Sequence, residues 1–189
     1  MALPALVAVD ENPDVLNSVE AQLIRRYASD YRIECLHDPA EAVRTLSRLK
    51  DTAVDVALVL VGQSLSDASR VELLGQVRRL YPHAKRVLLV APNPWSDART
   101  SQVIRASMAL GRIDFYMVRP SLSRDEVFHA GVSDFLLDWA RERSLVPETV
   151  HIVGEEWSGR AYELRETFAS CAVPHAFCLA DSEQGVNYY

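Results

Sequence analysis

The chain has 189 residues, of which 49% are hydrophobic and 24% are charged, a composition that supports a packed core and argues against a disordered chain. Its net charge of −6 and isoelectric point near 5.4 argue against a general binder of nucleic acid or anionic membranes, because neither polyanion is attracted to such a surface. The start "MALPALVAVD" lacks a basic leader, and no segment reaches the roughly 20 apolar residues of a membrane span, so we expect a cytoplasmic protein.

The three cysteines, Cys35, Cys171 and Cys178, have spacings that match neither a metal site nor a Cys-x-x-Cys motif. An odd number of cysteines in a cytoplasmic protein favours free thiols over a disulfide framework. We therefore expect reduced, buried cysteines.

Short apolar segments alternate strictly with amphipathic segments over about the first 143 residues. The predicted strands cover residues 5–9, 31–36, 54–61, 85–91 and 113–118. The predicted helices include residues 16–27, 38–49, 71–80, 96–110 and 123–144. Because right-handed crossovers place successive strands of this kind in one parallel sheet, we predict a doubly wound, five-stranded α/β fold with helices on both faces.

Residue types support several of these elements. The stretch "VDVALVLV" has no polar alternation, as expected of a central parallel strand that is covered on both faces. Asp38 is free to cap the second helix, which Pro39 begins. The apolar face predicted for the third helix consists of Val71, Leu74, Val77 and Leu80. The apolar face predicted for the fifth helix consists of Phe128, Val132, Phe135, Leu136 and Trp139.

The residues that end the strands are the informative ones, because in open α/β sheets the functional crevice lies beyond the carboxyl ends of the strands. Here these residues are Asp10, Glu11, Gly62, Val90, Ala91, Arg119 and Pro120. The stretches that contain them read "VAVDENPDV", "VDVALVLVGQSLSDASRVELL", "KRVLLVAP" and "IDFYMVRP". In their order and content they resemble the response-regulator receiver family of bacterial two-component and phosphorelay systems, whose fold is a flavodoxin-like five-stranded sheet. We expect residues 1–145 to form this receiver-like domain.

The resemblance implies roles for the strand-end residues. In the family, an acidic pair binds magnesium, an aspartate accepts a phosphoryl group, and a serine or threonine and a lysine hold the phosphate. Asp10 and Glu11 match the acidic pair. The other three positions hold Gly62, Val90 and Arg119 in place of the aspartate, the hydroxyl residue and the lysine.

Phosphotransfer by the family mechanism is not expected, because neither Gly62 nor Gln63 supplies a carboxylate nucleophile. Val90 has no hydrogen-bond donor for a phosphate, so the contact that draws the fourth helix inward would be missing. Tyr116 matches the switch aromatic of the family and could still rotate in response to a partner.

Arg119 keeps the positive charge of the family lysine and could pair with Asp10 or Glu11, which would hold one conformation. We expect no resident cofactor. Magnesium at Asp10 and Glu11 would bind weakly, because the third carboxylate of the family site is missing.

A relocated phosphoacceptor is an open alternative to the loss of phosphotransfer. Asp67, or the hydroxyl groups of Ser64 and Ser66, would be the candidates. The sequence specifies no groups that would clamp a phosphate there, and this alternative makes the chain a working phosphorelay receiver.

Residues 146–189 predict a further β-α-β unit, with a strand at 149–155, a helix at 157–173 and a strand at 174–181. This unit resembles the opening half of a thioredoxin- or glutaredoxin-like domain. The stretch "WSGR" stands where that family has a Cys-x-x-Cys motif, and it carries no thiol. A redox role for Cys171 or Cys178 is therefore not expected.

A receiver-like domain followed by a degenerate thioredoxin-like segment resembles the N-terminal region of fusions with a flavin-dependent thioredoxin-reductase-like enzyme. The chain has no GxGxxG fingerprint, so a flavin or nicotinamide site would lie outside it, in a downstream oxidoreductase domain. This resemblance implies that the chain would be the regulatory part of such an oxidoreductase, with no catalysis of its own.

We expect a non-enzymatic regulatory module, a pseudo-receiver that binds a protein partner or forms a homodimer. The surface of the fourth helix, fifth strand and fifth helix is the predicted contact. No helix-turn-helix follows the receiver part, so nucleic acid is not an expected partner, and neither is a membrane.

Overall fold

The protein is described by a computed structural model, which covers residues 2–121, 125–143, 150–170, 173 and 175–186. The chain divides into two compact units, residues 1–142 (unit 1) and residues 143–189 (unit 2).

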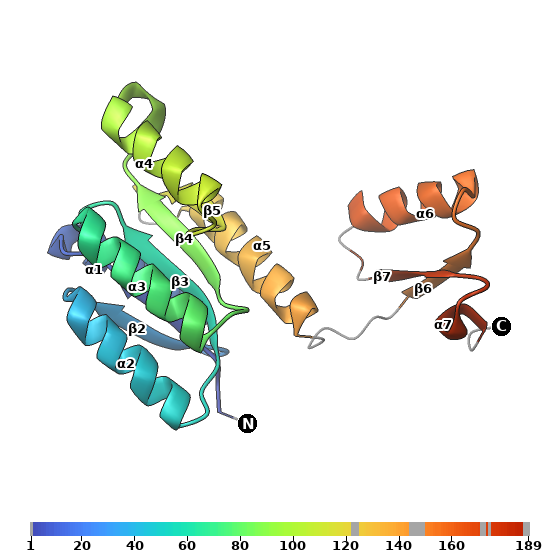
Figure 1. The fold of residues 1–189 in the computed structure, drawn as a ribbon, viewed down its shortest axis with the longest axis horizontal. Coiled ribbons are helices and arrows are strands. Elements are labelled where there is room, and N and C mark those ends of the chain that lie inside the picture. Colours follow the sequence, from blue (N-terminus) through green and yellow to red (C-terminus); the bar gives the residue numbers. More distant parts are fainter. Residues whose placement is uncertain (1, 122–124, 144–149, 171–172, 174, 187–189) are drawn as a thin grey trace. The chain divides into compact units, whose positions relative to one another are not determined.

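In unit 1, five strands alternate with five helices in the predicted order (Figure 1). The elements are β1 (Ala5–Val9), α1 (Pro13–Tyr27), β2 (Arg32–Leu36), α2 (Pro39–Asp51), β3 (Val56–Gly62), α3 (Asp67–Leu80), β4 (Lys85–Val90), α4 (Ala98–Ala109), β5 (Phe115–Val118) and α5 (Glu126–Glu142). A 3-10 turn, η1 (Pro94–Ser96), which the sequence pattern did not predict, separates β4 from α4.

The five strands form one sheet in the order β2-β1-β3-β4-β5, and every neighbouring pair is parallel. This confirms the predicted doubly wound, flavodoxin-like α/β fold. All seven residues of β3 are buried, as expected for the central strand of a sheet that is covered on both faces.

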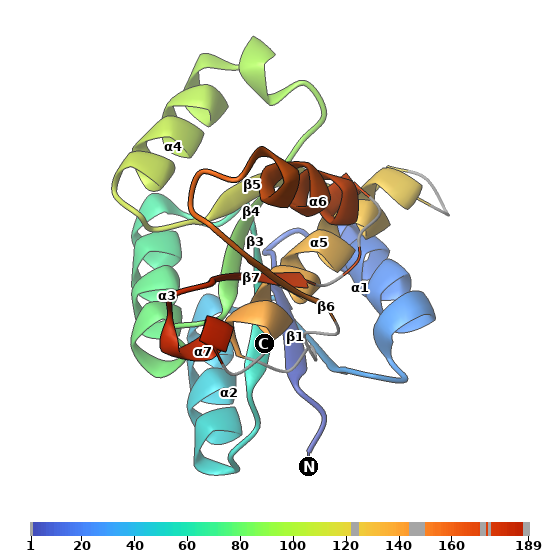
Figure 2. The same cartoon turned by 90° about the vertical axis from the view of Figure 1, so that its right-hand side faces the viewer.

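Two hydrophobic clusters, one on each face of the sheet, hold unit 1 together. Ala5, Val7 and Val9 of β1 face the cluster that contains side chains of α2, α3 and α4. Leu6 and Ala8 face the cluster of α1 and α5, because successive side chains of a strand point to opposite faces. Figure 2 shows α2 and α3 on one side of the strands and α1 on the other.

Polar side chains at the strand-to-helix turns fix where the helices begin. The N-cap residues Asn12, Asp38, Ser66 and Asp97 each accept a hydrogen bond from a backbone N–H in the first turn of α1 to α4. A side-chain oxygen at this position satisfies one of the free N–H groups of a helix start. The caps therefore determine where the loops that follow the strands end. The candidate site lies in these loops.

The apolar face predicted for α5 is confirmed, because all five of its side chains are at most 9% exposed. The face predicted for α3 was partly wrong. Val71 is 40% exposed, whereas Leu73, which was not assigned to the face, is fully buried. The helix is rotated so that Arg70, Leu73 and Val77 point inward, and Val71 is left on the side toward α4.

Unit 2 contains β6 (Val150–Gly154), α6 (Gly159–Ser170), β7 (His175–Leu179) and a short α7 (Glu183–Val186), which was not predicted. β6 and β7 pair in parallel, so the unit is a β-α-β unit with one added turn of helix. A Cβ at Gly154 would lie 3.2 Å from Cβ of Ala161, so the glycine allows α6 to approach β6 closely.

Among the described residues, no helix has both the length and the apolar character that crossing a membrane requires.

Candidate functional site

Four of the predicted site residues lie together at one edge of the sheet. Asp10 follows β1, Gly62 ends β3, Val90 ends β4 and Arg119 follows β5. These four strands are neighbours, and parallel strands have their carboxyl ends at the same edge. The backbone therefore brings these four residues to the same edge of the sheet, as the sequence analysis expected.

The Asp10 side chain is folded inward over the end of β3. Asp10 is only 4% exposed. Its Oδ1 accepts hydrogen bonds from the backbone N–H of Asn12, at 2.8 Å, and from the hydroxyl group of Ser64. These two donors stabilise a buried carboxylate that would otherwise be costly to remove from water.

Gly62 leaves the space that this carboxylate occupies. A Cβ at position 62 would overlap Oδ2 and Cγ of Asp10 and would lie 2.9 Å from its Cβ. The reason for glycine here is close approach and not a left-handed backbone, since Gly62 has no positive φ. The Asp10 carboxylate thus lies where a side chain at the acceptor position would begin.

The ends of β3 and β4 are joined by the Gln63 side chain. Its Oε1 accepts a hydrogen bond from the backbone N–H of Ala91 at 2.9 Å. Val90, at the hydroxyl position of the family, is fully buried, and its carbonyl accepts from the N–H of Arg119 at 2.9 Å. The Gln63 bond was not predicted, although a polar side chain directly after a buried strand is a signal for such a bridge.

The predicted pairing of Arg119 with Asp10 or Glu11 is absent from the part of the chain that the structure describes. Arg119 is half-buried. The physical reason is that Asp10 is buried and already accepts two hydrogen bonds, while Glu11 is exposed. Among the described residues, Arg119 therefore forms no ion pair that would hold this edge of the sheet in one conformation.

Asp10 and Glu11 do not act as a pair of metal ligands in this conformation. Glu11 lines a separate cavity of 310 Å³, together with Asp38 and Glu72. Within the described ranges, no three His, Cys, Asp or Glu side chains come close enough to hold a metal ion. Because Mg²⁺ requires near-octahedral oxygen ligands, these residues do not fit the magnesium site that the family resemblance implies. Weak magnesium binding stays a prediction.

Tyr116, at the position of the switch aromatic, is half-buried against the core on the α2, α3 and α4 face. Its ring contacts Trp95 of η1 edge to face, with the ring centroids 5.7 Å apart and the planes at 88°. Trp95 is 55% exposed. The sequence analysis did not predict this aromatic pair. The tryptophan in the segment between β4 and α4 could have indicated it.

The alternative acceptors have other roles in the structure. The Ser64 hydroxyl bonds to Asp10, and Ser66 caps α3 by accepting from the N–H of Ser69 at 3.1 Å. The Asp67 carboxylate forms an ion pair with Arg70. A carboxylate held by a guanidinium is a weaker nucleophile than a free one, so this pairing disfavours Asp67 as an acceptor.

The two described cysteines are free thiols, of which Cys35 is partly buried and Cys178 is buried. Burial, followed by the charges of Glu20 and Glu34, raises the pKa of the Cys35 thiol to about 12. Cys178 is 7% exposed, and Cys171 lies outside the described residues. In the stretch "WSGR" before α6, Ser158 accepts from the N–H of Ala161 at 3.3 Å, as a helix cap would.

Comparisons with known proteins rest on structure, because no protein-family model and no curated protein sequence matches the chain. A signal receiver domain of an HD domain-containing protein from Pseudomonas fluorescens Pf-5 is similar over 77% of this chain and 96% of its own, with a TM-score of 0.58 and 20% identity. A CheY-like receiver domain protein from Methanospirillum hungatei JF-1 is similar over 75% and 99%, with a TM-score of 0.54 and 19% identity.

A structure described as adenylate cyclase from Rhodopirellula baltica is similar over 76% of this chain and 94% of its own, with a TM-score of 0.57 and 12% identity. At these identities the likeness concerns the fold alone. Together with the strand order and the all-parallel sheet, it shows that unit 1 has the fold of a response-regulator receiver domain.

Proposed function

We propose that the chain is a pseudo-receiver, a regulatory module that keeps the receiver fold, does not accept a phosphoryl group and acts through contacts with protein. The observation that carries this proposal is the Asp10 carboxylate over Gly62. A phosphoryl acceptor at the end of β3 needs a side chain with an oxygen nucleophile, and that volume is already filled.

Three further features support the proposal. Val90 offers no hydrogen-bond donor where a phosphate would be held. The hydrogen bonds that Asp10 accepts from Asn12 and Ser64 hold its carboxylate over Gly62. Asp67, the carboxylate nearest in sequence that could replace the acceptor, is paired with Arg70.

The partner that we propose is a second copy of the chain, bound through the surface of α4, β5 and α5. β5 is an edge strand of only four residues. Four large apolar side chains of α4, β5 and the turn between them are exposed, namely Met108, Leu110, Phe115 and Val118. An unpaired strand edge next to exposed apolar side chains is the usual character of an interface between chains.

A titration with magnesium and beryllofluoride, which mimics a phosphoryl group bound to an acceptor aspartate, tests the proposal. We expect no change in the amide NMR spectrum of unit 1 at residues near Gly62 and Val90, and no change in Trp95 fluorescence. A receiver domain with an intact acceptor aspartate is the positive control. Saturable changes around the ends of β3 and β4 in the native protein would overturn the proposal.

Dimerisation is measured separately by sedimentation equilibrium over a range of protein concentrations. Phe115→Asp should weaken the dimer, because it places a charge in the apolar face. The matched control is Ile24→Asp, since Ile24 is 50% exposed and belongs to α1, outside the proposed surface. A monomer at all concentrations would contradict the proposed partner but not the loss of phosphotransfer.

A further inference from the structure

Two cavities adjoin in the groove between α3 and α4. One has a volume of 320 Å³ and lies at the start of both helices, and the other, of 360 Å³, lies further along them. They share Asp67 and Arg70 of α3 with Arg99 and Val103 of α4, so they form one continuous groove. Cavities of about 300–1,000 Å³ are the size at which proteins bind small molecules.

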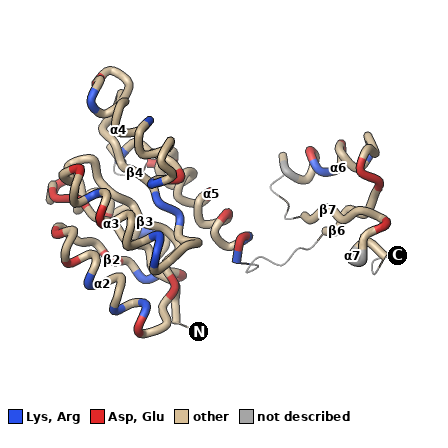
Figure 3. Tube along the Cα trace, viewed as in Figure 1, with Lys and Arg blue, Asp and Glu red and all other residues tan. Residues whose placement is uncertain are grey.

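The groove is rich in positive charge. Arg70, Arg99 and Arg112 line it, against the carboxylates of Asp67 and Asp97. From residue 98 to residue 113 the chain has three arginines and no acidic residue, and Figure 3 shows the basic positions along α4. This part of unit 1 is therefore cationic although the chain as a whole carries a charge of −6.

Both carboxylates in the groove are already engaged. Asp67 is paired with Arg70, whose Nη1 also donates to the carbonyl of Leu65 at 3.0 Å. Hydrogen bonds from the Thr100 hydroxyl and backbone N–H, in that order, lower the pKa of Asp97, and the charge of Arg99 adds to them. In the described part of the chain, neither Arg99 nor Arg112 forms a salt bridge.

The remaining lining residues include hydroxyl and apolar side chains, and the hydroxyl groups of Ser64 and Thr100 already donate to Asp10 and Asp97. The hydroxyl groups of Ser64, Ser66 and Thr100 lie at the end where α3 and α4 begin. Leu88, Val103 and Val71 give the groove an apolar wall, and the exposure of Val71 at 40% is explained by its place there. Guanidinium donors beside an apolar wall suit a ligand with phosphate oxygens on an apolar or aromatic body.

We propose that this groove binds a small phosphorylated molecule, with Arg99 and Arg112 as the groups that bind its phosphate oxygens and Val71 and Val103 in contact with its apolar body. The site lies beside the family's acceptor position and does not use Asp10 or Gly62. It is thus independent of the proposed loss of phosphotransfer.

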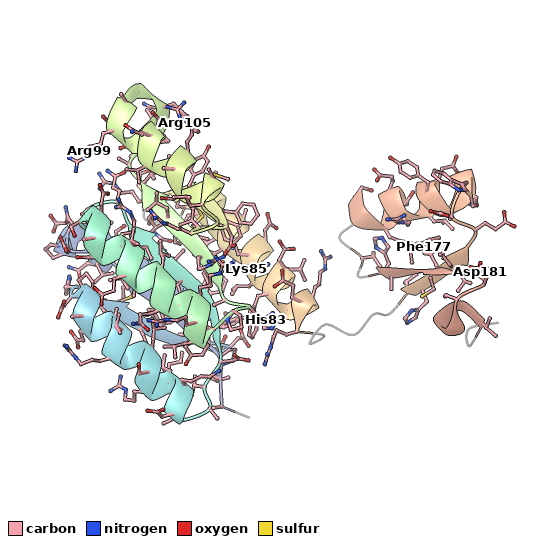
Figure 4. All side chains as sticks on the ribbon, in the orientation of Figure 1. His83, Lys85, Arg99, Arg105, Phe177 and Asp181 are labelled. Carbon is pink, nitrogen blue, oxygen red and sulfur yellow. The ribbon has the colours of Figure 1, made fainter. Side chains whose placement is uncertain are left out.

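Isothermal titration calorimetry of the full chain with ADP, inorganic pyrophosphate and citrate tests the proposal. We expect ADP to bind more tightly than pyrophosphate, and citrate more weakly than both. Arg99→Ala and Arg112→Ala should each weaken ADP binding about tenfold or more, because each removes a charged hydrogen-bonding group. The matched control is Arg105→Ala: Arg105 is on α4 but extends to the opposite side from Arg99 in Figure 4 and donates to Ser101.

No ADP binding at millimolar concentration, or equal losses for Arg105→Ala and Arg99→Ala, would overturn the site. Pyrophosphate as tight as ADP would contradict the role of the apolar wall, and citrate as tight as ADP would contradict the preference for phosphate. Far-UV circular dichroism of each variant shows whether it is folded. None of these results depends on the beryllofluoride titration, so the two proposals fail separately.

Discussion

At the scale of single residues, the Asp10 carboxylate and a side chain at position 62 would require the same space. The glycine has no side chain, and the aspartate carboxylate fills the resulting space while it accepts hydrogen bonds from Asn12 and Ser64. Restoring an aspartate at position 62 alone would therefore not restore a receiver site, because Asp10 must first move.

Gly62→Ala should destabilise unit 1 by about 1–3 kcal/mol, the usual cost of inserting a methyl group where there is no room. The midpoint of urea unfolding measures this loss. In an Asp10→Ala background the loss should be smaller, because the two nearest atoms are then gone.

Gly75→Ala is the matched control for that substitution. Gly75 is exposed in the interior of α3, and a Cβ there would meet nothing within 4 Å. Alanine should stabilise the helix at this position by roughly 0.5–1 kcal/mol. Equal effects at the two glycines would show that Asp10 does not occupy the space over Gly62.

Cys35 should react slowly with iodoacetamide at pH 8, because burial raises the pKa of its thiol to about 12 and only the thiolate is nucleophilic. Mass spectrometry of the alkylated protein, before and after unfolding in urea, measures the reaction. The linked effect on stability has a definite sign: stability falls as the pH rises from about 9 toward about 12, since the unfolded chain loses this proton first. Alkylation of the folded protein at the rate of the unfolded chain would contradict the burial.

At the scale of elements, α1 and α5 are joined by a buried polar network. The Nε2 atom of His129 lies 3.0 Å from Oε1 of Gln22, and the Tyr27 hydroxyl donates to the His129 carbonyl at 3.0 Å. His129 is 3% exposed, and its Nδ1 has no hydrogen-bond partner among the residues that the structure describes. Protonation of this histidine would place a charge between the two helices.

Burial, followed by the charge of Arg26, lowers the pKa of His129 below its usual 6.5, although Glu126 and Asp125 act in the opposite direction. The unfolded chain therefore takes up this proton first as the pH falls, and stability should decrease below about pH 6.5. Urea unfolding at pH 7.5 and pH 5.5 measures the decrease, which should be smaller in His129→Gln. An equal decrease in both proteins would assign it to other groups.

Tyr81 joins α2 to the segment before β3 through one hydroxyl group. It donates to the carbonyl of Leu46 at 3.1 Å and is also 3.2 Å from that of Val54. Tyr81→Phe removes the hydrogen bonding of this hydroxyl group and should cost about 0.5–1.5 kcal/mol in the free energy of unfolding. Tyr162→Phe is the control, since Tyr162 is 64% exposed, and an equal cost for both would contradict the role of the hydroxyl.

At the scale of the whole molecule, unit 1 has a complete core of its own. Both of its hydrophobic clusters are built from residues between Ala5 and Ala140, and the unit ends at residue 142. A chain of residues 1–142 should therefore fold alone and unfold in one cooperative transition, as followed by circular dichroism in urea. A fragment without a cooperative transition would show that its core is incomplete.

The fold could be predicted from the sequence because the hydrophobic periodicity shows which segments are strands and which are helices. The run "VDVALVLV" and the alternating segments around it leave few arrangements other than a parallel sheet. The candidate site was harder to predict, because it depends on side-chain rotamers. Gly62 was recognisable as a missing acceptor, but the sequence does not show that Asp10 turns over it. The groove of Arg99 and Arg112 depends on how α3 and α4 lie together, which also explains the error at Val71.

The most direct test of the account is the intact mass of the native protein after incubation with acetyl phosphate and magnesium, next to a receiver domain with its acceptor aspartate as the positive control. A pseudo-receiver should keep an unchanged mass, whereas the control should gain one phosphoryl group. A stoichiometric phosphoryl adduct on the native protein would contradict this expectation and would direct the search for the acceptor to Asp67.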